Sequence, residues 1–319
     1  MRRISHRPSG TPGDPAAGLY VEEVAVPRPA ADELLIRVEA VGVSLPMVRR
    51  TWGPRPVPAL GGETAGEVVA LGADVTGYRV GERVTGVVFG SAYAEYALLH
   101  RAMASRVPAG ASAVDAVALV RGGVVALGAL ESAAPRRGES ALLTAAAAGV
   151  GHLALQLARS RGLSRVVAAV SDPAKAGFLR GLGADEVVVY GSGEETDPAA
   201  TDWRGPHGVV LDGVGGELLT PLVGALGPGG RLVAYSSGGG TIAGADLLAG
   251  GRAAIGFQIA RIALEEPERY AGWRAELWRR FAAGELRAVV HEEVPLAEAA
   301  RAHRLVTDRV NRGRVVLVP

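Results

Sequence analysis

The segment between residues 141 and 160 has the residue types and spacing best suited to chemistry. An apolar run at 141–146 leads into a turn of alanine and glycine, followed by a helical pattern. Small residues at a strand-to-helix turn let backbone amides approach a diphosphate at the positive helix N-terminus. The spacing is Ala146-x-Ala148-x-x-Gly151 rather than G-x-G-x-x-G, so the motif alone is weak. The flanking strand and helix patterns favour a dinucleotide site over a turn that only packs a helix against a strand.

A second candidate position follows the next predicted strand, at 166–170. There the chain reads Ser171-Asp172-Pro173-Ala174-Lys175. Asp172 before Pro173 is typical of a helix N-cap, and Gly183 is placed to end that helix. Ser171 and Lys175 remain to bind a 2′-phosphate, which favours NADPH over NADH. The alternative is that Lys175, the only lysine of the chain, is a solvated surface residue.

Composition excludes several other kinds of chemistry. The 319 residues are 48% hydrophobic and include 45 glycines but no cysteine, and the net charge is +1. Without cysteine there is no disulfide, thiolate nucleophile, iron–sulfur cluster or Cys-ligated zinc, and a reducing cytoplasm fits best. The balanced charge favours neither nucleic acid nor an anionic membrane as a partner. Residues 1–18 lack the apolar stretch of a secretory signal, so we expect no export.

Other catalytic or membrane motifs are not supported by the sequence. There is no G-x-x-x-x-G-K-[ST], and the glycine that would close a nucleophile elbow is missing from 42–46 and from 138–142. The six histidines show no metal-ligand spacing, and we expect them to pack or lie at the surface. The uncharged stretch 140–158 contains polar and turn residues, which predict a strand, a turn and a helix rather than a membrane span.

The patterns divide the chain into two predicted domains. Short β-branched runs at 34–41, 66–71, 83–88 and 93–99 predict a compact β domain. A helical spacing follows at 113–130. Apolar strands at 141–146, 166–170, 186–190, 209–211 and 232–235 then alternate with helices, which specifies a parallel sheet. Amphipathic helices around Trp273 to Phe281 and at 297–305 precede a closing strand at 314–318.

The order and spacing of several motifs resemble the medium-chain dehydrogenase/reductase superfamily, specifically its zinc-free quinone oxidoreductase branch, which includes zeta-crystallin and enoyl reductases. The motifs that carry the resemblance are Arg37-Val-Glu-Ala-Val-Gly-Val43, Gly61-Gly-Glu-Thr-Ala-Gly-Glu-Val68, Gly77-Tyr-Arg-Val-Gly-Glu-Arg-Val84, Ala92-Tyr-Ala-Glu-Tyr96, Ala147-Ala-Gly-Val-Gly151, Leu182-Gly-Ala-Asp185, Asp212-Gly-Val-Gly-Gly216, Gly229-Gly-Arg-Leu-Val233 and Gly313-Arg-Val-Val-Leu317. The resemblance implies an α/β protein with a GroES-like catalytic domain (1–116, completed by 263–319) and a Rossmann domain with a doubly wound parallel sheet (117–262). It further implies an NADPH site in the cleft between them and a homodimer formed through the Rossmann sheets.

The resemblance also implies roles for particular residues. Gly149, Val150 and Gly151 match the diphosphate turn, and Ser171, Lys175 and Tyr190 match positions near the 2′-phosphate. Val214, Ser236 and Phe257 fall in segments on the nicotinamide side, and Arg309 resembles a C-terminal coenzyme contact. Other positions depart from the family pattern: Ser44 stands in Gly42-Val-Ser-Leu-Pro-Met47 where relatives often read Gly-Val-Asn-x-x-Asp, Val125 replaces a common threonine, and Arg55 aligns with an active-site tyrosine of some relatives.

The function predicted from these residues is hydride transfer from NADPH to an activated C=C of an enone, enoyl or quinone-type substrate. An enoyl reductase of secondary metabolism, acting on polyketides, is one form of it. Ser44 or water is the expected proton donor, and the alternative for Ser44 is a turn hydroxyl. We expect Glu63 to anchor backbone between the domains. A zinc-free alcohol dehydrogenase or ketone reductase, and a catalytically silent NADPH-binding scaffold, remain as alternatives.

Overall fold

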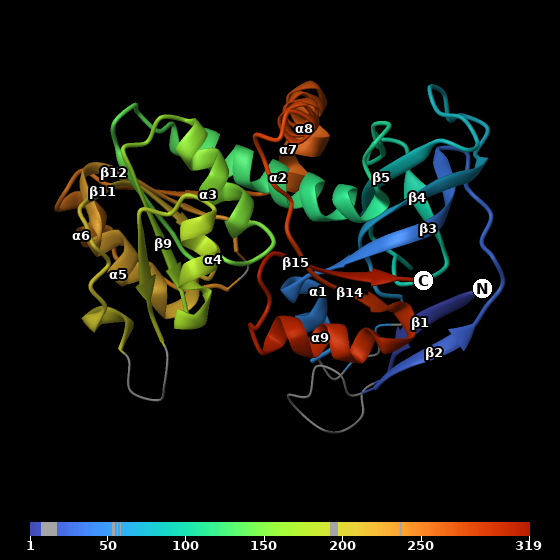
Figure 1. Ribbon diagram of the computed structural model, residues 1–319, viewed down its shortest axis with the longest axis horizontal. Coiled ribbons are helices and arrows are strands. Elements are labelled where there is room, and N and C mark those ends of the chain that lie inside the picture. The colour runs from blue at the N-terminus through green and yellow to red at the C-terminus, as the bar shows by residue number, and fades with distance from the viewer. Residues whose placement is uncertain (8–17, 53–54, 56, 58, 192–196, 237) are drawn as a thin grey trace. The chain divides into compact units, whose positions relative to one another are not determined.

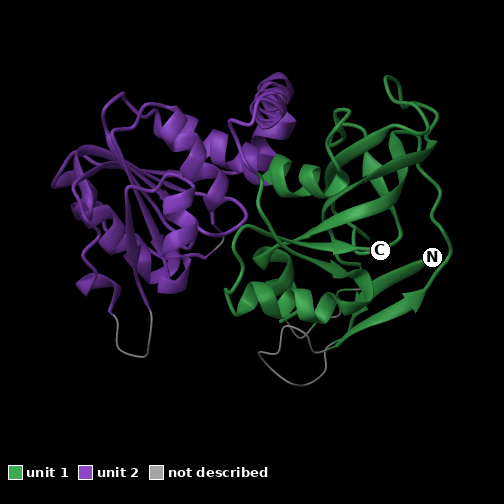
Figure 2. Cartoon of the chain, in the orientation of Figure 1, with its two compact units in different colours: residues 1–121, 288–319 green, residues 122–287 purple. Residues whose placement is uncertain are grey.

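The computed structural model describes residues 1–7, 18–52, 55, 57, 59–191, 197–236 and 238–319. The chain forms two compact units, one made of residues 1–121 and 288–319 and the other of residues 122–287 (Figure 2). The strands of the first unit form a two-stranded and a larger sheet, and those of the second unit form one sheet. The helix α2 (Ala113–Ala133) contributes its first residues to one unit and its remaining residues to the other.

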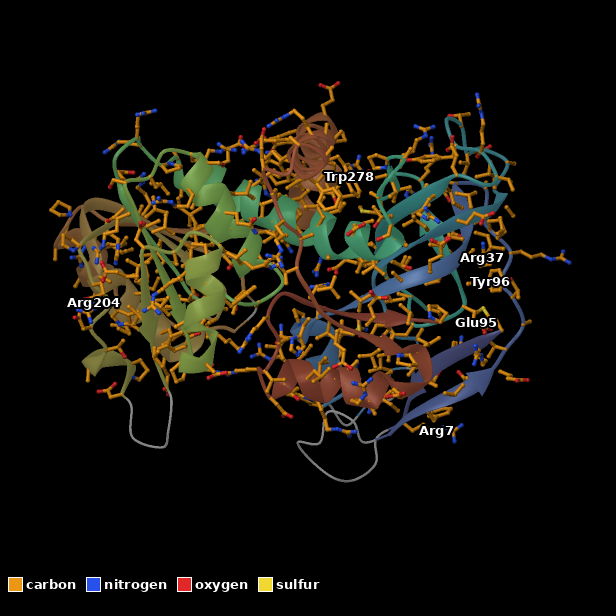
Figure 3. The ribbon with its side chains drawn as sticks, viewed as in Figure 1. Arg7, Arg37, Glu95, Tyr96, Arg204 and Trp278 are labelled. Carbon is orange, nitrogen blue, oxygen red and sulfur yellow. The ribbon has the colours of Figure 1, made fainter. Side chains whose placement is uncertain are left out.

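The first unit is built on β-strands, as the sequence predicts (Figure 1). Its large sheet has the order β14-β15-β3-β4-β5-β7, and β6 pairs with β3. All neighbours are antiparallel except β14 and β15. The strands of the unit are β1 (Arg2–His6), β2 (Leu19–Glu23), β3 (Glu33–Val43), β4 (Gly62–Leu71), β5 (Arg83–Val88), β6 (Tyr96–His100), β7 (Ser105–Arg106), β14 (Val290–Pro295) and β15 (Arg314–Val318). Arg37 and Tyr96 face each other across β3 and β6 (Figure 3).

The second unit is a parallel sheet with helices between its strands. The strand order is β10-β9-β8-β11-β12-β13, and every neighbouring pair is parallel. The strands are β8 (Ser140–Leu143), β9 (Arg165–Val170), β10 (Glu186–Val189), β11 (His207–Asp212), β12 (Leu226–Ala234) and β13 (Ala253–Gly256). In chain order this is 3-2-1-4-5-6, which is the doubly wound Rossmann arrangement. The predicted α/β fold is therefore confirmed.

Short helices connect these strands and pack on them. In the second unit α3 packs on β8 and β9, α4 on β10, and α5 on β11 and β12. The helices other than α2 are α1 (Leu45–Arg50), α3 (Gly151–Ser160), α4 (Ala176–Gly181), α5 (Leu219–Gly224), α6 (Gly244–Leu248), α7 (Ile259–Glu265), α8 (Pro267–Ala282) and α9 (Ala299–Thr307). Residues 140–158 form the predicted strand, turn and helix. Within the described part of the chain, α2 alone is long and apolar enough to cross a membrane, and 83% of its most apolar window is buried inside the protein.

Most predicted strands are present, with differences at their ends. The strand predicted at 141–146 ends at Leu143, because the chain turns from Thr144 onward. The strand predicted at 232–235 begins at Leu226 and runs through a Gly-Pro-Gly-Gly stretch that resembles a loop in sequence. The strands β1, β2, β13 and β14 were not predicted, because they are short and lack a strong apolar alternation.

The limits of the compact units differ from the predicted domain limits. The second unit continues to residue 287 and so includes α8 and the last residues of α7, which were expected in the first domain. The reason is packing on α2: Trp273 donates its indole N–H to Glu131 at 2.7 Å, and Leu277 lies against Gly123. Trp273 and Trp278 are both buried on α8, as expected for packing residues, and Figure 3 labels Trp278. The predicted domain limits, with residues 1–116 and 263–319 in one domain and residues 117–262 in the other, remain a prediction.

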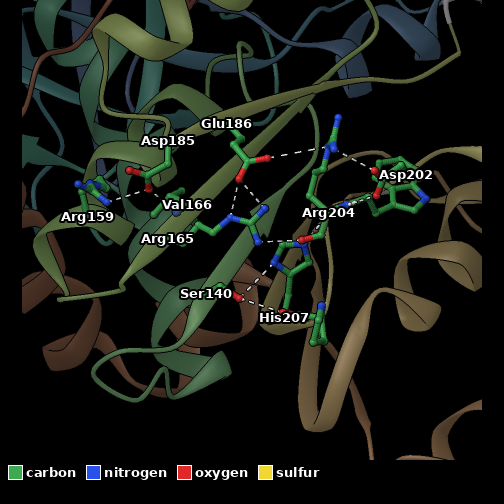
Figure 4. A network of polar contacts seen from close by, with 11 residues as sticks. Ser140, Arg159, Arg165, Val166, Asp185, Glu186, Asp202, Arg204 and His207 are labelled. Carbon is green, nitrogen blue, oxygen red and sulfur yellow. Dashed lines mark hydrogen bonds and ion pairs between the residues drawn. The ribbon is translucent and has the colours of Figure 1, made fainter.

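Two polar networks fasten the amino-terminal side of the parallel sheet. Arg231 on β12 binds both carboxylate oxygens of Glu139 at 2.8 Å and donates to the carbonyls of Ala133 and Ala134, which end α2. Figure 4 shows the second network. In it the Arg165 guanidinium pairs with the Glu186 carboxylate, and the Ser140 hydroxyl oxygen lies 3.3 Å from His207 Nδ1. Apart from Arg231, which lies within β12 opposite the first residue of β13, these residues lie at or next to strand starts, so these contacts are at the amino-terminal side of the sheet.

The Arg231–Glu139 pair should contribute measurably to stability. Replacing Arg231 with Met removes four hydrogen bonds and leaves the mostly buried Glu139 carboxylate with only the Arg136 N–H and a 3.9 Å ion pair to the exposed Arg136 guanidinium, so we expect a loss of about 2 kcal/mol in the free energy of unfolding. Denaturant unfolding measures the loss. Arg261→Leu is the matched control: its pair with Glu265 is solvent-exposed, and the loss should stay below about 0.5 kcal/mol.

The same pair predicts a pH dependence. The hydrogen bond from Arg231 is the main reason that the pKa of Glu139 lies below its ordinary value of 4.5. A lowered carboxyl pKa contributes stability that is present above pH 4.5 and is lost as the pH falls through the lowered pKa. The stability difference between wild type and Arg231→Met should therefore shrink below pH 4.5. A difference that stays constant down to pH 2 would contradict this assignment.

Candidate functional site

The turn between β8 and α3 leaves no room for a side chain where the helix begins. Ala145 has a left-handed backbone with φ +46°, and Ala148 donates its N–H to the Ala145 carbonyl at 2.9 Å. A Cβ atom on Gly151 would lie 2.2 Å from that same carbonyl oxygen. The start of α3 therefore lies directly against the end of β8, and only glycine permits this approach at position 151.

The N-terminus of α3 has no side-chain cap. Val150 occupies the N-cap position and has no side-chain acceptor. His152 follows in the first turn, but burial lowers its pKa to about 4, and its Nδ1–H donates to the Ala148 carbonyl at 2.9 Å. The imidazole is therefore neutral at neutral pH. An anion at this helix end is attracted by backbone amides and the helix dipole.

The parallel sheet brings most of the predicted coenzyme residues to one edge. Ser171, Tyr190, Val214, Ser236 and Phe257 each follow the carboxyl end of a strand of this sheet within two residues. The turn 149–151 follows β8 at the same edge, beside α3. Since β8 and β11 are neighbours from which the chain winds in opposite directions, this is a topological switch point, where open α/β sheets bind ligands.

On the β9 side, the local structure agrees with the interpretation of Asp172. Its carboxylate accepts the Ala174 N–H at 2.9 Å as the N-cap, and Gly183 has φ +102° beyond the end of α4. Lys175 is only 5% exposed, so the alternative of a solvated surface lysine is wrong. Tyr190 is mostly buried, and its ring lies 5.7 Å from that of Trp203.

On the β11 side, the side chains hold two loops together. The Ser236 hydroxyl donates to the Val214 carbonyl at 2.7 Å and accepts the Gly238 N–H at 3.0 Å. Thr144 donates its hydroxyl to Asp212 at 2.7 Å. The sequence reasoning did not identify Thr144 or Asp212 as site residues. The available signal was that each is a polar residue at the carboxyl end of an apolar strand.

Phe257 occupies a packed position. Its ring centre lies 6.3 Å from that of Trp273. The Phe257 Cζ atom lies only 2.2 Å from the position that a Cβ atom on Gly128 would take. The Phe257 N–H donates to the Ala234 carbonyl at 2.9 Å. The backbone of residue 257 is therefore at the carboxyl edge, whereas the ring is committed to contacts with α2 and α8.

The remaining candidates lie elsewhere. Ser44 is the N-cap residue of α1 in the first unit, is half-buried and makes no side-chain capping hydrogen bond. Arg309 follows α9 in the same unit, with φ +55°. Arg55 is exposed and Val125 is buried on α2.

Glu63 joins side chains rather than backbone. Its carboxylate accepts a hydrogen bond from Arg121 at 2.6 Å and forms an ion pair with Arg314, and all three residues belong to the first unit. The expectation that Glu63 anchors backbone between domains is therefore corrected. Burial lowers the pKa of Arg314 to about 10, which still leaves the guanidinium charged at neutral pH. Gly42 makes this pair possible, since a Cβ there would lie 2.4 Å from the Glu63 carboxylate.

No group of three or more His, Asp or Glu side chains suited to a metal ion occurs among the residues that the structure describes. The buried histidines have other contacts: His303 packs edge-on against Tyr93 and His207 contacts the Trp203 carbonyl at 2.9 Å.

Comparisons with known proteins match this arrangement. Residues 30–109 match the alcohol dehydrogenase GroES-like domain and residues 182–317 match the zinc-binding dehydrogenase model. The quinone oxidoreductase of Pseudomonas aeruginosa is 30% identical over 92% of this chain and 93% of its own length. The chain belongs to the zinc-free quinone oxidoreductase branch of the medium-chain dehydrogenases/reductases. As a member of that branch it is an oxidoreductase.

Solved structures and longer relatives extend the comparison. Escherichia coli quinone oxidoreductase complexed with NADPH superposes with a TM-score of 0.88 at 26% identity, and both chains are fully covered. A mycobacterial protein complexed with NADPH gives a TM-score of 0.89 at 29% identity, again over both full chains. NorB of the spectinabilin polyketide synthase system from Streptomyces orinoci is 33% identical over 95% of this chain, which spans only 14% of NorB.

The close approach at Gly151 predicts a sharp substitution effect. Gly151→Ala places a methyl group against the Ala145 carbonyl, so we expect the free energy of unfolding to fall by about 2 kcal/mol or more. Gly177→Ala in α4 is the control, because nothing lies within 4 Å of its Cβ position and alanine favours a helix. Urea unfolding of both variants makes the comparison. Equal stabilities would mean that the turn relaxes freely and has no need of glycine.

Proposed function

We propose that this protein transfers hydride from NADPH to the C=C bond of an α,β-unsaturated carbonyl compound. The observation that carries the proposal is the set of predicted coenzyme residues at the carboxyl edge of one parallel sheet, beside an uncapped helix N-terminus. Its support from relatives is the match to two structures complexed with NADPH.

The residues present fit this coenzyme. The turn at Gly149, Val150 and Gly151 brings backbone close enough to seat a diphosphate. On the β9 side Ser171, Lys175 and Tyr190 would hold the adenosine 2′-phosphate. On the β11 side Val214, Ser236 and the backbone of Phe257 would hold the nicotinamide, and Arg309 would add a contact from the C-terminal segment. The bound coenzyme supplies the hydride.

An activated C=C bond is the acceptor that best suits this site. The chain has no cysteine with which to build the zinc site of the alcohol dehydrogenase branch. In a conjugated carbonyl compound the β-carbon accepts the hydride pair, the C=C π electrons move toward the carbonyl, and an enolate oxygen holds the negative charge. A proton added at the α-carbon completes the reduction.

Ser44 is the proposed donor of that proton. It sits at the start of α1, and its hydroxyl is not used to cap the helix. A hydroxyl that does not cap the helix can donate its proton to the substrate, and the serine can then take up a proton from water. The competing role, that of a turn hydroxyl, predicts no effect of Ser44→Ala on proton transfer.

Among conjugated substrates, both quinones and enoyl thioesters satisfy this chemistry. The P. aeruginosa relative is named a quinone oxidoreductase, and NorB belongs to a polyketide synthase system. We propose the enone class as a whole, with an enoyl group of a polyketide intermediate as one member. A zinc-free ketone reductase and a silent NADPH-binding scaffold are the competing functions.

We further propose a cytoplasmic homodimer joined through the parallel sheets, without nucleic-acid or membrane partners. The strand β13 is at the end of the sheet order, and its residues alternate between half-buried and exposed. Leu248 and Leu264, on nearby helices in the chain, are largely exposed. A solution mass of twice 32.7 kDa is the expected result in light scattering.

Turnover with paired substrates tests the proposed reaction. We expect NADPH oxidation with cyclohexenone-type enones or quinones and at least 100-fold slower oxidation with the matching saturated ketones, because only the conjugated acceptor delocalises the charge. Ser44→Ala should lower kcat about tenfold or more and alter its solvent isotope effect, with KM for NADPH unchanged. Faster reduction of the ketones would favour the ketone reductase, and tight NADPH binding with no turnover of any acceptor would favour the scaffold.

Coenzyme choice gives a second test. Lys175→Met keeps the buried stem volume but removes the charge, so we expect the Kd for NADPH to rise about tenfold or more while the Kd for NADH changes less than twofold. Arg180→Met is the control, since Arg180 is an exposed cation on α4, the helix that begins directly after Lys175. Fluorescence titration of both coenzymes gives the constants. Equal losses for NADPH and NADH in Lys175→Met would remove Lys175 from the 2′-phosphate site.

A further inference from the structure

The carboxylate of Asp212 is buried at the switch point of the parallel sheet. Asp212 is the last residue of β11 and has no solvent exposure. The neighbouring strand β8 ends at Leu143, and the next residue, Thr144, binds the Asp212 carboxylate. The side chain therefore lies where the two halves of the sheet diverge, on the β11 side of the diphosphate turn.

The hydrogen bonds of this carboxylate are those of an ionised acceptor. Oδ1 accepts from the Thr144 hydroxyl at 2.7 Å and from the Val214 N–H at 3.0 Å, and Oδ2 accepts from the Gly215 N–H at 2.8 Å. In each of the three bonds the partner is a donor and the carboxylate provides only lone pairs. The Asp212 charge also affects Tyr235. Burial is the main reason that the pKa of Tyr235 is raised, and the Asp212 carboxylate makes a smaller contribution in the same direction.

No cation compensates this charge locally. Among the described residues, no Lys, Arg or His forms an ion pair with Asp212. The buried carboxylates Glu63 and Glu139, in contrast, each bind arginine. A buried charge without a counter-ion is costly, so its position at a ligand-binding edge suggests a ligand that carries the opposite charge.

We propose that Asp212 selects the oxidised state of the coenzyme by placing a fixed negative charge beneath the nicotinamide. The inference rests on the proposed function, which puts the nicotinamide on the β11 side. The reduced ring is neutral and the oxidised ring carries one positive charge. Asp212 therefore strengthens the binding of NADP⁺ relative to NADPH. The same charge stabilises the positive charge that develops on the ring as hydride leaves.

The surrounding contacts fix this charge relative to the loop above it. Besides the two amides bound to Asp212, the Gly213 N–H donates to Thr144 Oγ1 at 2.9 Å. The Gly216 N–H donates to the Gly239 carbonyl at 2.8 Å. The loop after β11 is thus held at both its start and its end. A preorganised charge of this kind acts without rearrangement during the reaction.

The ratio of two dissociation constants tests the proposal. In Asp212→Asn the side chain keeps its shape but loses its charge, and we expect Kd(NADP⁺)/Kd(NADPH) to rise about tenfold. The ratio for NAD⁺ and NADH should rise by the same factor, since the charge acts on the ring and not on the 2′-phosphate. Calorimetry or fluorescence titration measures all four constants without turnover.

Thr144→Val is the matched control. It removes a hydrogen bond to Asp212 and the acceptor for Gly213 but keeps the charge, so both affinities should weaken together and leave the ratio unchanged within about twofold. An unchanged ratio in Asp212→Asn, or an equal change of ratio in both variants, would overturn the proposal.

Binding of 2′,5′-ADP separates this inference from the proposed function. That ligand lacks the nicotinamide, so Asp212→Asn should bind it as wild type does, which also reports a correctly folded site. If wild type binds neither 2′,5′-ADP nor NADPH, the proposed coenzyme fails rather than the role of Asp212. Should Asp212→Asn not fold, the wild-type ratio decides: NADPH binding more than tenfold tighter than NADP⁺ would contradict a dominant charge at position 212.

Discussion

The close contact between the start of α3 and the turn after β8 is the constraint on which the proposed coenzyme site depends. Gly151 lies so near the Ala145 carbonyl that no side chain fits. This contact keeps the start of α3 at the carboxyl edge of the sheet, where the loops after β9, β11 and β12 also emerge. A wider turn would hold the helix start farther from that edge. The arrangement of small residues matters more than a literal G-x-G-x-x-G spacing, because Ala146 and Ala148 are small enough for the same turn.

The buried carboxylates of Glu63 and Glu139 differ from that of Asp212 in the groups that bind them. Glu139 and Glu63 are bound by arginines, which fasten α2 to the parallel sheet and β4 to β15. Asp212 instead receives only neutral donors. Hydroxyl and amide dipoles can hold a carboxylate in place without cancelling its charge, so its field extends to whatever lies above the β11 loop. Among the described residues, Asp212 thus differs from Glu63 and Glu139 in having no arginine bound to it.

Local patterns predicted most of the scaffold, whereas contacts between distant residues escaped them. The strands β5 and β15 were placed to the residue, because apolar runs bounded by turn residues are local signals. The N-cap role of Asp172 was also predicted from a local signal, the proline that follows it. The partners of Glu63 could not be predicted, since Arg121 and Arg314 are 58 and more residues away. Thr144 and Asp212 are separated by 68 positions and meet only when β8 pairs with β11. Their pairing requires the strand order of the sheet, which the local alternation of strands and helices does not specify.

The two ends of the proposed coenzyme site differ in charge. The choice between NADPH and NADH and the preference for one oxidation state can therefore be set by different residues. On the β9 side a buried cation, Lys175, follows a capped turn. On the β11 side a buried anion, Asp212, lies under a clamped loop. The 2′-phosphate is present in both oxidation states, so a cation near it sets which coenzyme binds but not which oxidation state. A charge near the nicotinamide acts in the opposite way, because only that ring changes its charge during the reaction. The sheet keeps these groups on opposite sides of the switch point between β8 and β11, and a substitution at one end therefore leaves the electrostatics of the other end largely intact.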